Sequence, residues 1–282
     1  MKSFIRAFQQ YAHVNDKENR WTLPDWSSAL LWTRARNSGG IKVVLDILGE
    51  FTTNKSEMED AKKAYLHLID TVSNEGINAS ITVKASALGS TFDKITCASH
   101  ISEIAEKSNA RKVGFELDME GRSLVDFTLE VAVACRNAGY PVTLALQAYL
   151  DRTPRDLDKV MASGIRVRLV KGAYVGDLTD FIKIQDRFKS LTATLIDSGA
   201  SFCIGTHDPE LIDWTAGKLA ESKERIEFGM LKGLSDSTKL DLVGKRWIVS
   251  EYVPFGKNKV AYESRRKAYL RTLKNVNRQP AP

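Results

Sequence analysis

The sequence predicts an α/β protein with the fold of a (β/α)8 TIM-type barrel, distorted and preceded by a short helical segment. Eight runs rich in aliphatic and β-branched residues begin near residue 41, and helical patterns separate them. Eight such units occupy roughly 235 residues, which matches a (β/α)8 barrel in number and length. A doubly wound sheet is the alternative that this alternation leaves open.

The first 38 residues have a different pattern from the rest. Aromatic and polar residues recur there at short helical spacings, and Gly39 and Gly40 separate them from the first apolar run. We therefore expect two parts, an N-terminal helical segment over residues 1–38 and a catalytic barrel domain over residues 39–282.

Each expected strand is a short apolar run bounded by polar residues or glycine. The eight runs cover residues 41–48, 79–84, 112–119, 142–148, 167–171, 201–207, 225–231 and 246–253. The clearest helical patterns cover residues 58–72, 123–139 and 179–199. Ser123 is the expected N-cap of the second helix, and Gly139 is its expected stop.

Composition indicates a globular protein with a sizeable core. The chain has 282 residues, of which 43% are hydrophobic and 27% charged. It has no apolar run of the roughly 18 residues that span a membrane and no signal-peptide core, so a cytoplasmic location is expected. Cys97, Cys135 and Cys203 are scattered, which predicts reduced thiols that pack in the core.

The net charge of +6 is spread along the chain and forms no basic block. Nucleic-acid binding is therefore disfavoured, whereas peripheral attraction to an anionic membrane surface stays possible. No GxGxxG motif follows a strand and no GxxxxGK[ST] motif occurs, which argues against a Rossmann NAD enzyme. No metal site is expected, because His13, His67, His100 and His207 are far apart.

Polar residues gather where the expected strands end. In a barrel, the C-terminal strand ends meet at one rim, which is where active sites form. Any single one of these residues could instead be a helix cap or a solvated loop residue. The rim residues are Asp46, Lys84, Asp118, Glu120, Gln147, Arg168, Lys171, Thr206, His207, Asp208 and Tyr252.

Several of these residues are cations, and the last helical pattern adds more. Arg265 and Arg266 are adjacent, which suits two-point capture of a carboxylate, and Tyr262 and Tyr269 share their helix face. The rim is therefore expected to bind an anion. Ordinary ion pairs or a solvated basic helix end would also account for these charges.

The segments VRLVKGAY, THD, DME, LQAYL and YVPFG followed by YESRR resemble the signature segments of the proline dehydrogenase family. The similarity runs in the same order from LDILGE near Asp46, through KASALG at Lys84, to Arg266. The resemblance implies a distorted (β/α)8 barrel that holds FAD non-covalently at the strand ends. It also implies oxidation of L-proline to 1-pyrroline-5-carboxylate by hydride transfer from C5 to flavin N5, the first step of proline catabolism. Electrons would pass to a quinone, and the length predicts the monofunctional form.

The resemblance also implies roles for individual residues. Arg168 would lie beside flavin N5 as a catalytic cation, and Asp118 would orient Lys84 and the flavin side of the site. Lys84, Arg265 and Arg266 would pair with the substrate carboxylate. Substrate contacts would also come from Tyr252 over the ring, Leu231 as apolar packing and Tyr174, which closes the pocket. The cofactor would also be held by Met119, Gln147, Lys171, Gly172, Ala173, Thr206 and His207.

Four positions depart from the family pattern. Tyr269 stands where the family has a glutamate, Gly229 replaces a glutamine, Lys259 a tryptophan and Phe255 a tyrosine. Hydroxyproline or a modified proline is therefore an alternative substrate, although Tyr252 favours an unsubstituted ring. A Schiff-base lyase that uses Lys84 or Lys171, or an inactive barrel, is a further alternative.

Overall fold

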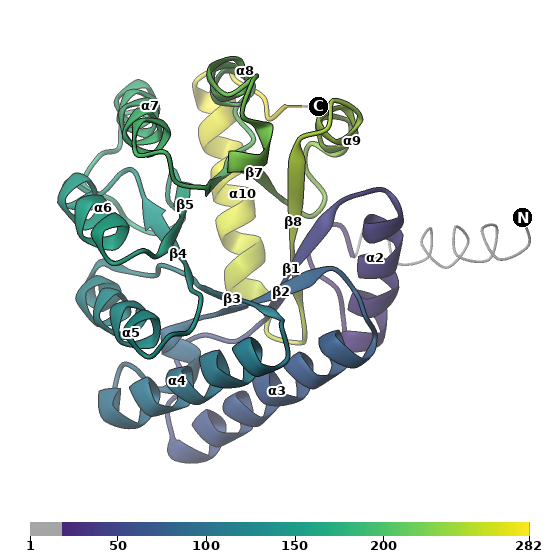
Figure 1. Cartoon of the computed structure of the whole chain (residues 1–282), viewed down its shortest axis with the longest axis vertical. Coiled ribbons are helices and arrows are strands. Elements are labelled where there is room, and N and C mark those ends of the chain that lie inside the picture. Colours follow the sequence, from purple (N-terminus) through teal and green to yellow (C-terminus); the bar gives the residue numbers. More distant parts are fainter. Residues whose placement is uncertain (1–18, 282) are drawn as a thin grey trace, which may run out of the picture.

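The computed structural model describes residues 19–281, and its centre is a closed barrel of eight parallel strands (Figure 1). Each strand pairs with the next in sequence, and β8 pairs with β1. The strands are β1 (Lys42–Ile47), β2 (Ala79–Val83), β3 (Gly114–Leu117), β4 (Thr143–Gln147), β5 (Arg166–Val170), β6 (Phe202–Gly205), β7 (Ile226–Leu231) and β8 (Ile248–Phe255). The predicted barrel is confirmed, and each predicted strand corresponds to an observed one within a few residues.

A ring of helices covers the outside of the barrel (Figure 1). These are α2 (Trp26–Ser38), α3 (Lys55–Asn74), α4 (Lys94–Ala110), α5 (Val125–Asn137), α6 (Thr153–Ala162), α7 (Phe181–Asp197), α8 (Pro209–Lys218) and α9 (Asp236–Gly244). The last helix, α10 (Val260–Asn275), instead lies across the middle of the ring in this view. Side chains of α10 and of the strand ends line one cavity, so α10 lies over the C-terminal mouth of the barrel.

Side-chain caps start several of these helices, but not all of those that the sequence predicts. Asn54 accepts a hydrogen bond from the amide of Glu57 and so caps α3. The predicted cap at Ser123 is wrong, because Ser123 lies inside a short 3-10 turn, η2 (Arg122–Leu124), that leads into α5. The 3-10 turn leads directly into the first turn of α5, and no side chain among residues 19–281 caps this helix. Gly139, with φ +91°, follows the end of α5 as predicted.

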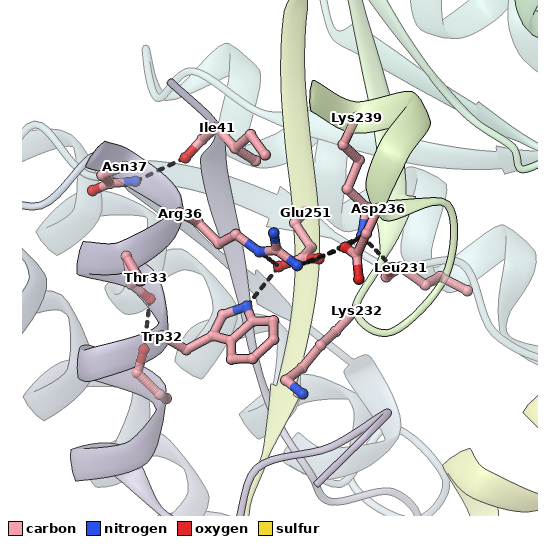
Figure 2. Close-up of polar contacts among 12 residues, drawn as sticks. Trp32, Thr33, Arg36, Asn37, Ile41, Leu231, Lys232, Asp236, Lys239 and Glu251 are labelled. Carbon is pink, nitrogen blue, oxygen red and sulfur yellow. Dashed lines mark hydrogen bonds and ion pairs between the residues drawn. The ribbon is translucent and has the colours of Figure 1, made fainter. Parts of the chain in front are cut away.

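Helix α2 is attached to the barrel by a cluster of buried charges behind β8 (Figure 2). Trp32 Nε1 and Arg36 Nε donate to Glu251 at 2.6 and 2.8 Å. Lys239 of α9 also bonds to Glu251, and its Nζ donates to the carbonyl oxygen of Leu231 at 2.9 Å. The helical segment is thus tied to Leu231, which lines the cavity at the barrel mouth. Residues 1–18 of the predicted segment lie outside the described residues, so the proposed boundary at residue 38 stays a prediction.

The remaining global features concern the membrane, metals and thiols. Among residues 19–281, no helix is long and apolar enough to cross a bilayer, and no three metal-binding side chains lie together. Cys97, Cys135 and Cys203 are buried free thiols, as predicted.

Candidate active site

A cavity of about 520 Å³ opens at the C-terminal ends of the strands. Its walls come from the strand ends, from α10 and from the loop between β5 and α7, hereafter the β5–α7 loop (residues 171–180). The structure brings every residue to which the resemblance gave a role to this cavity, whereas the rim residues Asp46, Glu120 and Asp208 do not line it. The residues with such a role are Lys84, Asp118, Met119, Gln147, Arg168, Lys171, Gly172, Ala173, Tyr174, Thr206, His207, Leu231, Tyr252, Arg265 and Arg266.

Lys84 follows β2 and is held by three oxygen atoms. Its Nζ lies 2.5 Å from Asp46 Oδ1, 3.2 Å from Asp118 Oδ2 and 3.1 Å from the Tyr252 hydroxyl. The Tyr252 hydroxyl in turn donates to Asp118 Oδ2 at 2.5 Å. An ammonium group has three protons to donate, so this set uses all of them.

The charge on Lys84 is stabilised by its neighbours. Burial alone lowers the pKa of Lys84, but the surrounding oxygens, Asp46 first, raise it well above the usual value. Lys84 therefore stays charged, which is the opposite of what a Schiff-base nucleophile needs. It acts as a fixed cation in the cavity wall.

Arg168 enters the cavity from inside the barrel, where two acids balance its charge. Its Nη2 makes an ion pair with Glu116 of β3, and Glu227 of β7 lies 3.9 Å away. The Nε of Arg168 is buried and has no hydrogen-bond partner within residues 19–281. Glu116 and Glu227 were not predicted, although an acid inside a buried strand was the available signal.

Two further basic residues, Lys171 and His207, line the cavity, and burial lowers the pKa of each. Lys171 donates to Asp208 at 2.7 Å. His207 Nε2 accepts the amide proton of Leu231 at 2.9 Å, which leaves the proton of the neutral ring on Nδ1. Burial, with the nearby cations Lys239, Arg266 and Lys171, lowers the pKa of His207 well below its usual range. The ring is therefore a neutral donor.

The two arginines of α10 differ in how they are paired. Arg265 bonds through both terminal nitrogens to Glu50, with 3.0 Å between Nη1 and Oε2, and lies over the Tyr174 ring. Arg266 lies 5.1 Å from the centre of the Tyr262 ring, and its buried Nε has no partner in the described part of the chain. Among the described residues, Arg266 is therefore less fully bonded than Arg265, whose guanidinium is held by Glu50.

Glu50 is a site residue that the sequence reasoning missed. It ends the LDILGE segment, directly after β1, so its place at the rim was the available signal. The sequence left open whether the arginine pair has a carboxylate partner, because Tyr269 replaces the family glutamate. Glu50 supplies that carboxylate to Arg265 from a different loop.

The four departures from the family pattern fall into two groups. Gly229 and Tyr269 line the cavity, and a Cβ on Gly229 would lie 3.2 Å from Cys203 Sγ. Phe255 packs against Trp26, and Lys259 pairs with Glu263 at 3.7 Å, and neither lines the cavity. Only the first two departures therefore affect the shape of the site.

Comparison with known proteins agrees with this geometry. The sequence profile of the family described as "Proline dehydrogenase" matches residues 31–270. The chain belongs to the proline dehydrogenase family. Proline dehydrogenase 2 of Bacillus subtilis is 28% identical over 251 residues, which cover 86% of this chain and 83% of that protein. The proline dehydrogenase of Deinococcus radiodurans is 28% identical over 257 residues, which cover 85% of this chain and 81% of that protein.

Solved structures show the same fold. Proline utilization A from Bdellovibrio bacteriovorus, inactivated by N-propargylglycine, superposes with a TM-score of 0.81 at 21% identity. The superposition covers 90% of this chain but only 32% of that one. The chain therefore spans about a third of the length of these larger proteins, and at such identity the likeness concerns the fold.

Proposed function

We propose that this member of the proline dehydrogenase family oxidises L-proline to 1-pyrroline-5-carboxylate with bound FAD and passes the electrons to a quinone. The observation that carries the proposal is that one cavity is lined by two arginines whose Nε atoms have no hydrogen-bond partner among residues 19–281. Arg266 comes from α10, whereas Arg168 comes from inside the barrel. One donor suits a carboxylate, and the other suits an electron-rich ring.

The residues of the cavity fit a flavin dinucleotide. The buried Nε of Arg168 has no partner among residues 19–281, the neutral His207 has Nδ1–H to donate, and Lys171 adds positive charge for phosphate. Gly172 and Gly205 leave stretches of backbone without side chains in the wall. We propose that these residues, with Met119, Gln147, Ala173 and Thr206, hold FAD. When bound, FAD supplies the acceptor for the hydride from C5 of proline.

The substrate would be positioned by its carboxylate. Arg266 offers an available donor, whereas Arg265 can bind a second carboxylate only by sharing or releasing Glu50. Tyr252, fixed by Lys84 and Asp118, provides a rigid ring against which the pyrrolidine can pack, with Leu231 beside it. The nearby cations oppose protonation of the substrate nitrogen, and a neutral amine is the form that gives up hydride.

The proposed setting of the enzyme is cytoplasmic, with peripheral contact at the inner face of the membrane. A quinone acceptor is lipid-soluble, and the net charge of +6 favours an anionic surface. Vesicles of anionic lipid should therefore bind the protein at low salt, and neutral vesicles should not.

A related imino acid is the second candidate substrate, and Gly229 is the observation that favours it. The family glutamine is absent there, so this part of the cavity wall lacks a polar side chain that the family has. Competition between L-proline and hydroxyproline for reduction of the enzyme distinguishes the two substrates.

The proposed reaction is tested by colour. Purified protein with FAD should be yellow and should bleach when L-proline is added without oxygen. The Arg266→Met variant should stay yellow but bleach only at far higher proline concentration. A wild-type protein that rejects FAD, or one that stays yellow with saturating proline and hydroxyproline, would contradict the proposal.

A further inference from the structure

Tyr149 is a buried residue of the LQAYL segment to which neither the resemblance nor the proposed reaction gives a role. It lies two residues after the end of β4, is 5% exposed and lines the cavity. Its hydroxyl donates to Gln147 Oε1 at 2.7 Å and accepts the amide proton of Tyr174 at 2.8 Å. Burial raises the pKa of Tyr149 to about 12, so the hydroxyl keeps its proton.

The backbone of Tyr149 also holds the β5–α7 loop at both ends. Its amide donates to the carbonyl oxygen of Lys171 at 3.1 Å. Its own carbonyl oxygen accepts the amides of Asp177 and Leu178 at 3.1 and 3.0 Å. One residue therefore contacts the beginning, the middle and the end of this loop.

Two glycines of the loop make room for the Tyr149 ring. A Cβ on Gly172 would lie 1.7 Å from Tyr149 Cε1, and a Cβ on Gly176 would lie 2.3 Å from Cδ2. Gly172 also has φ +132°, which side chains rarely adopt. The loop is thus shaped around this ring, and no larger residue fits at either position without displacing it.

The same hydroxyl fixes the amide of Gln147. The Nε2 of Gln147 donates to the carbonyl oxygen of Glu120 at 2.9 Å, and its Oε1 accepts from Tyr149. These two bonds occupy Oε1 and one of the two Nε2 protons. The second Nε2 proton remains free to donate to a ligand. Without the Tyr149 hydroxyl, Oε1 would lose its donor and the amide would be held through Nε2 alone.

We propose that Tyr149 is a positioning residue for the cofactor side of the cavity, which orders the β5–α7 loop and fixes the Gln147 amide before any ligand binds. The inference rests on the proposed function for the identity of that ligand, FAD. Its structural content, a loop held in place by one tyrosine, does not depend on the ligand.

The test replaces Tyr149 by Phe, which keeps the ring between the glycines and removes both hydroxyl contacts. The affinity for FAD, measured by flavin fluorescence, should fall about tenfold, as expected for lost buried hydrogen bonds. Hydrogen exchange, measured on the full chain with FAD and again with none added, should be at least about tenfold faster at the Tyr174 amide. The amides of Asp177 and Leu178 should keep their protection, because the Tyr149 carbonyl oxygen remains.

Tyr140→Phe is the matched control, because Tyr140 is partly buried and does not line the cavity. A second variant, Gly176→Ala, adds a methyl group against the ring and should weaken FAD binding in the same direction. Gly217→Ala is its control, because a Cβ there meets nothing within 4 Å.

Unchanged FAD affinity together with unchanged exchange at Tyr174 in Tyr149→Phe would overturn the inference. If the wild-type protein binds no FAD, the proposed function fails, but exchange at Tyr174 without FAD still decides whether Tyr149 orders the loop.

Discussion

Two buried charge clusters lie on opposite sides of β8 and differ in how completely they are paired. The Glu251 cluster (Trp32, Arg36, Asp236, Lys239 and Glu251) lies behind the strand, and none of its buried nitrogen or oxygen atoms lacks a partner (Figure 2). The Lys84 cluster (Asp46, Lys84, Asp118 and Tyr252) faces the cavity, and its buried Asp46 Oδ2 has no hydrogen-bond partner in the described part of the chain.

The neighbouring residues Glu251 and Tyr252 show how one strand serves both clusters. Successive side chains of a strand point to opposite faces, so Glu251 faces α2 and α9 while Tyr252 faces the cavity. Buried atoms without a partner among residues 19–281 also occur away from the cavity, as at His100 Nδ1 and Arg225 Nε. In the cavity, however, two of them are arginine nitrogens, Arg168 Nε and Arg266 Nε.

The largest effect is expected from breaking the Glu251 cluster. Glu251→Gln removes the buried charge on which Arg36 and Lys239 converge and leaves Asp236 as the acid that they share. Loss of one partner from a buried ionic cluster costs about 3–5 kcal/mol of unfolding free energy. Urea unfolding measures this loss.

Glu75→Gln is the control, because the Arg34–Glu75 pair lies at the surface and should contribute less than about 1 kcal/mol. A similarly small loss in Glu251→Gln would show that the Glu251 cluster does not stabilise the fold.

A second prediction concerns Lys232, which lies beside the Glu251 cluster. It is fully buried, with Nζ 3.8 Å from the centre of the Trp32 ring, and donates to backbone carbonyls of Asn19 and Arg20. Burial lowers its pKa from 10.5 to about 8, with Glu251 and Asp236 opposing the shift and Arg36 and Lys239 adding to it.

Between pH 8 and 10.5 the unfolded chain holds a proton at Lys232 that the folded chain has lost, so the folded state gains stability as pH rises. The unfolding free energy of wild type relative to Lys232→Met should therefore rise by up to about 3 kcal/mol across this range. Urea unfolding at several pH values measures it. A difference between the two proteins that is constant with pH would contradict the lowered pKa.

The third prediction tests the cavity side. Arg266→Met should raise the KM for L-proline about 10- to 100-fold, because it removes an available charged donor. Arg265→Met should raise KM less, because Glu50 already neutralises Arg265. Steady-state kinetics with FAD-loaded protein measures both, and Tm should change little. A larger effect at Arg265 than at Arg266 would reverse the assignment of the free donor.

Much of the fold and of the cavity wall could be predicted from the sequence. Eight alternating units favoured the barrel over a doubly wound sheet, the family resemblance implied the same fold, and polar residues at strand ends indicated the rim. Glu50 and Tyr149 were missed because their roles depend on contacts with residues far away in the sequence, Arg265 and Gly172. The predicted cap at Ser123 was wrong because a 3-10 turn starts the helix instead. Local sequence patterns do not specify which distant residue will form an ion pair or a packing contact with a given side chain.

The smallest expected effect comes from Tyr252→Phe, which keeps the ring and removes the hydroxyl between Lys84 and Asp118. Burial, with Asp118 and Asp46 nearby, raises the pKa of Tyr252 well above its usual value, so the hydroxyl donates at all working pH values. Its loss should lower kcat/KM for proline about fivefold to tenfold while unfolding free energy changes by only about 1 kcal/mol. A loss of several kcal/mol in stability with unchanged kcat/KM would instead place Tyr252 with the Glu251 cluster, and the contrast across β8 would no longer hold.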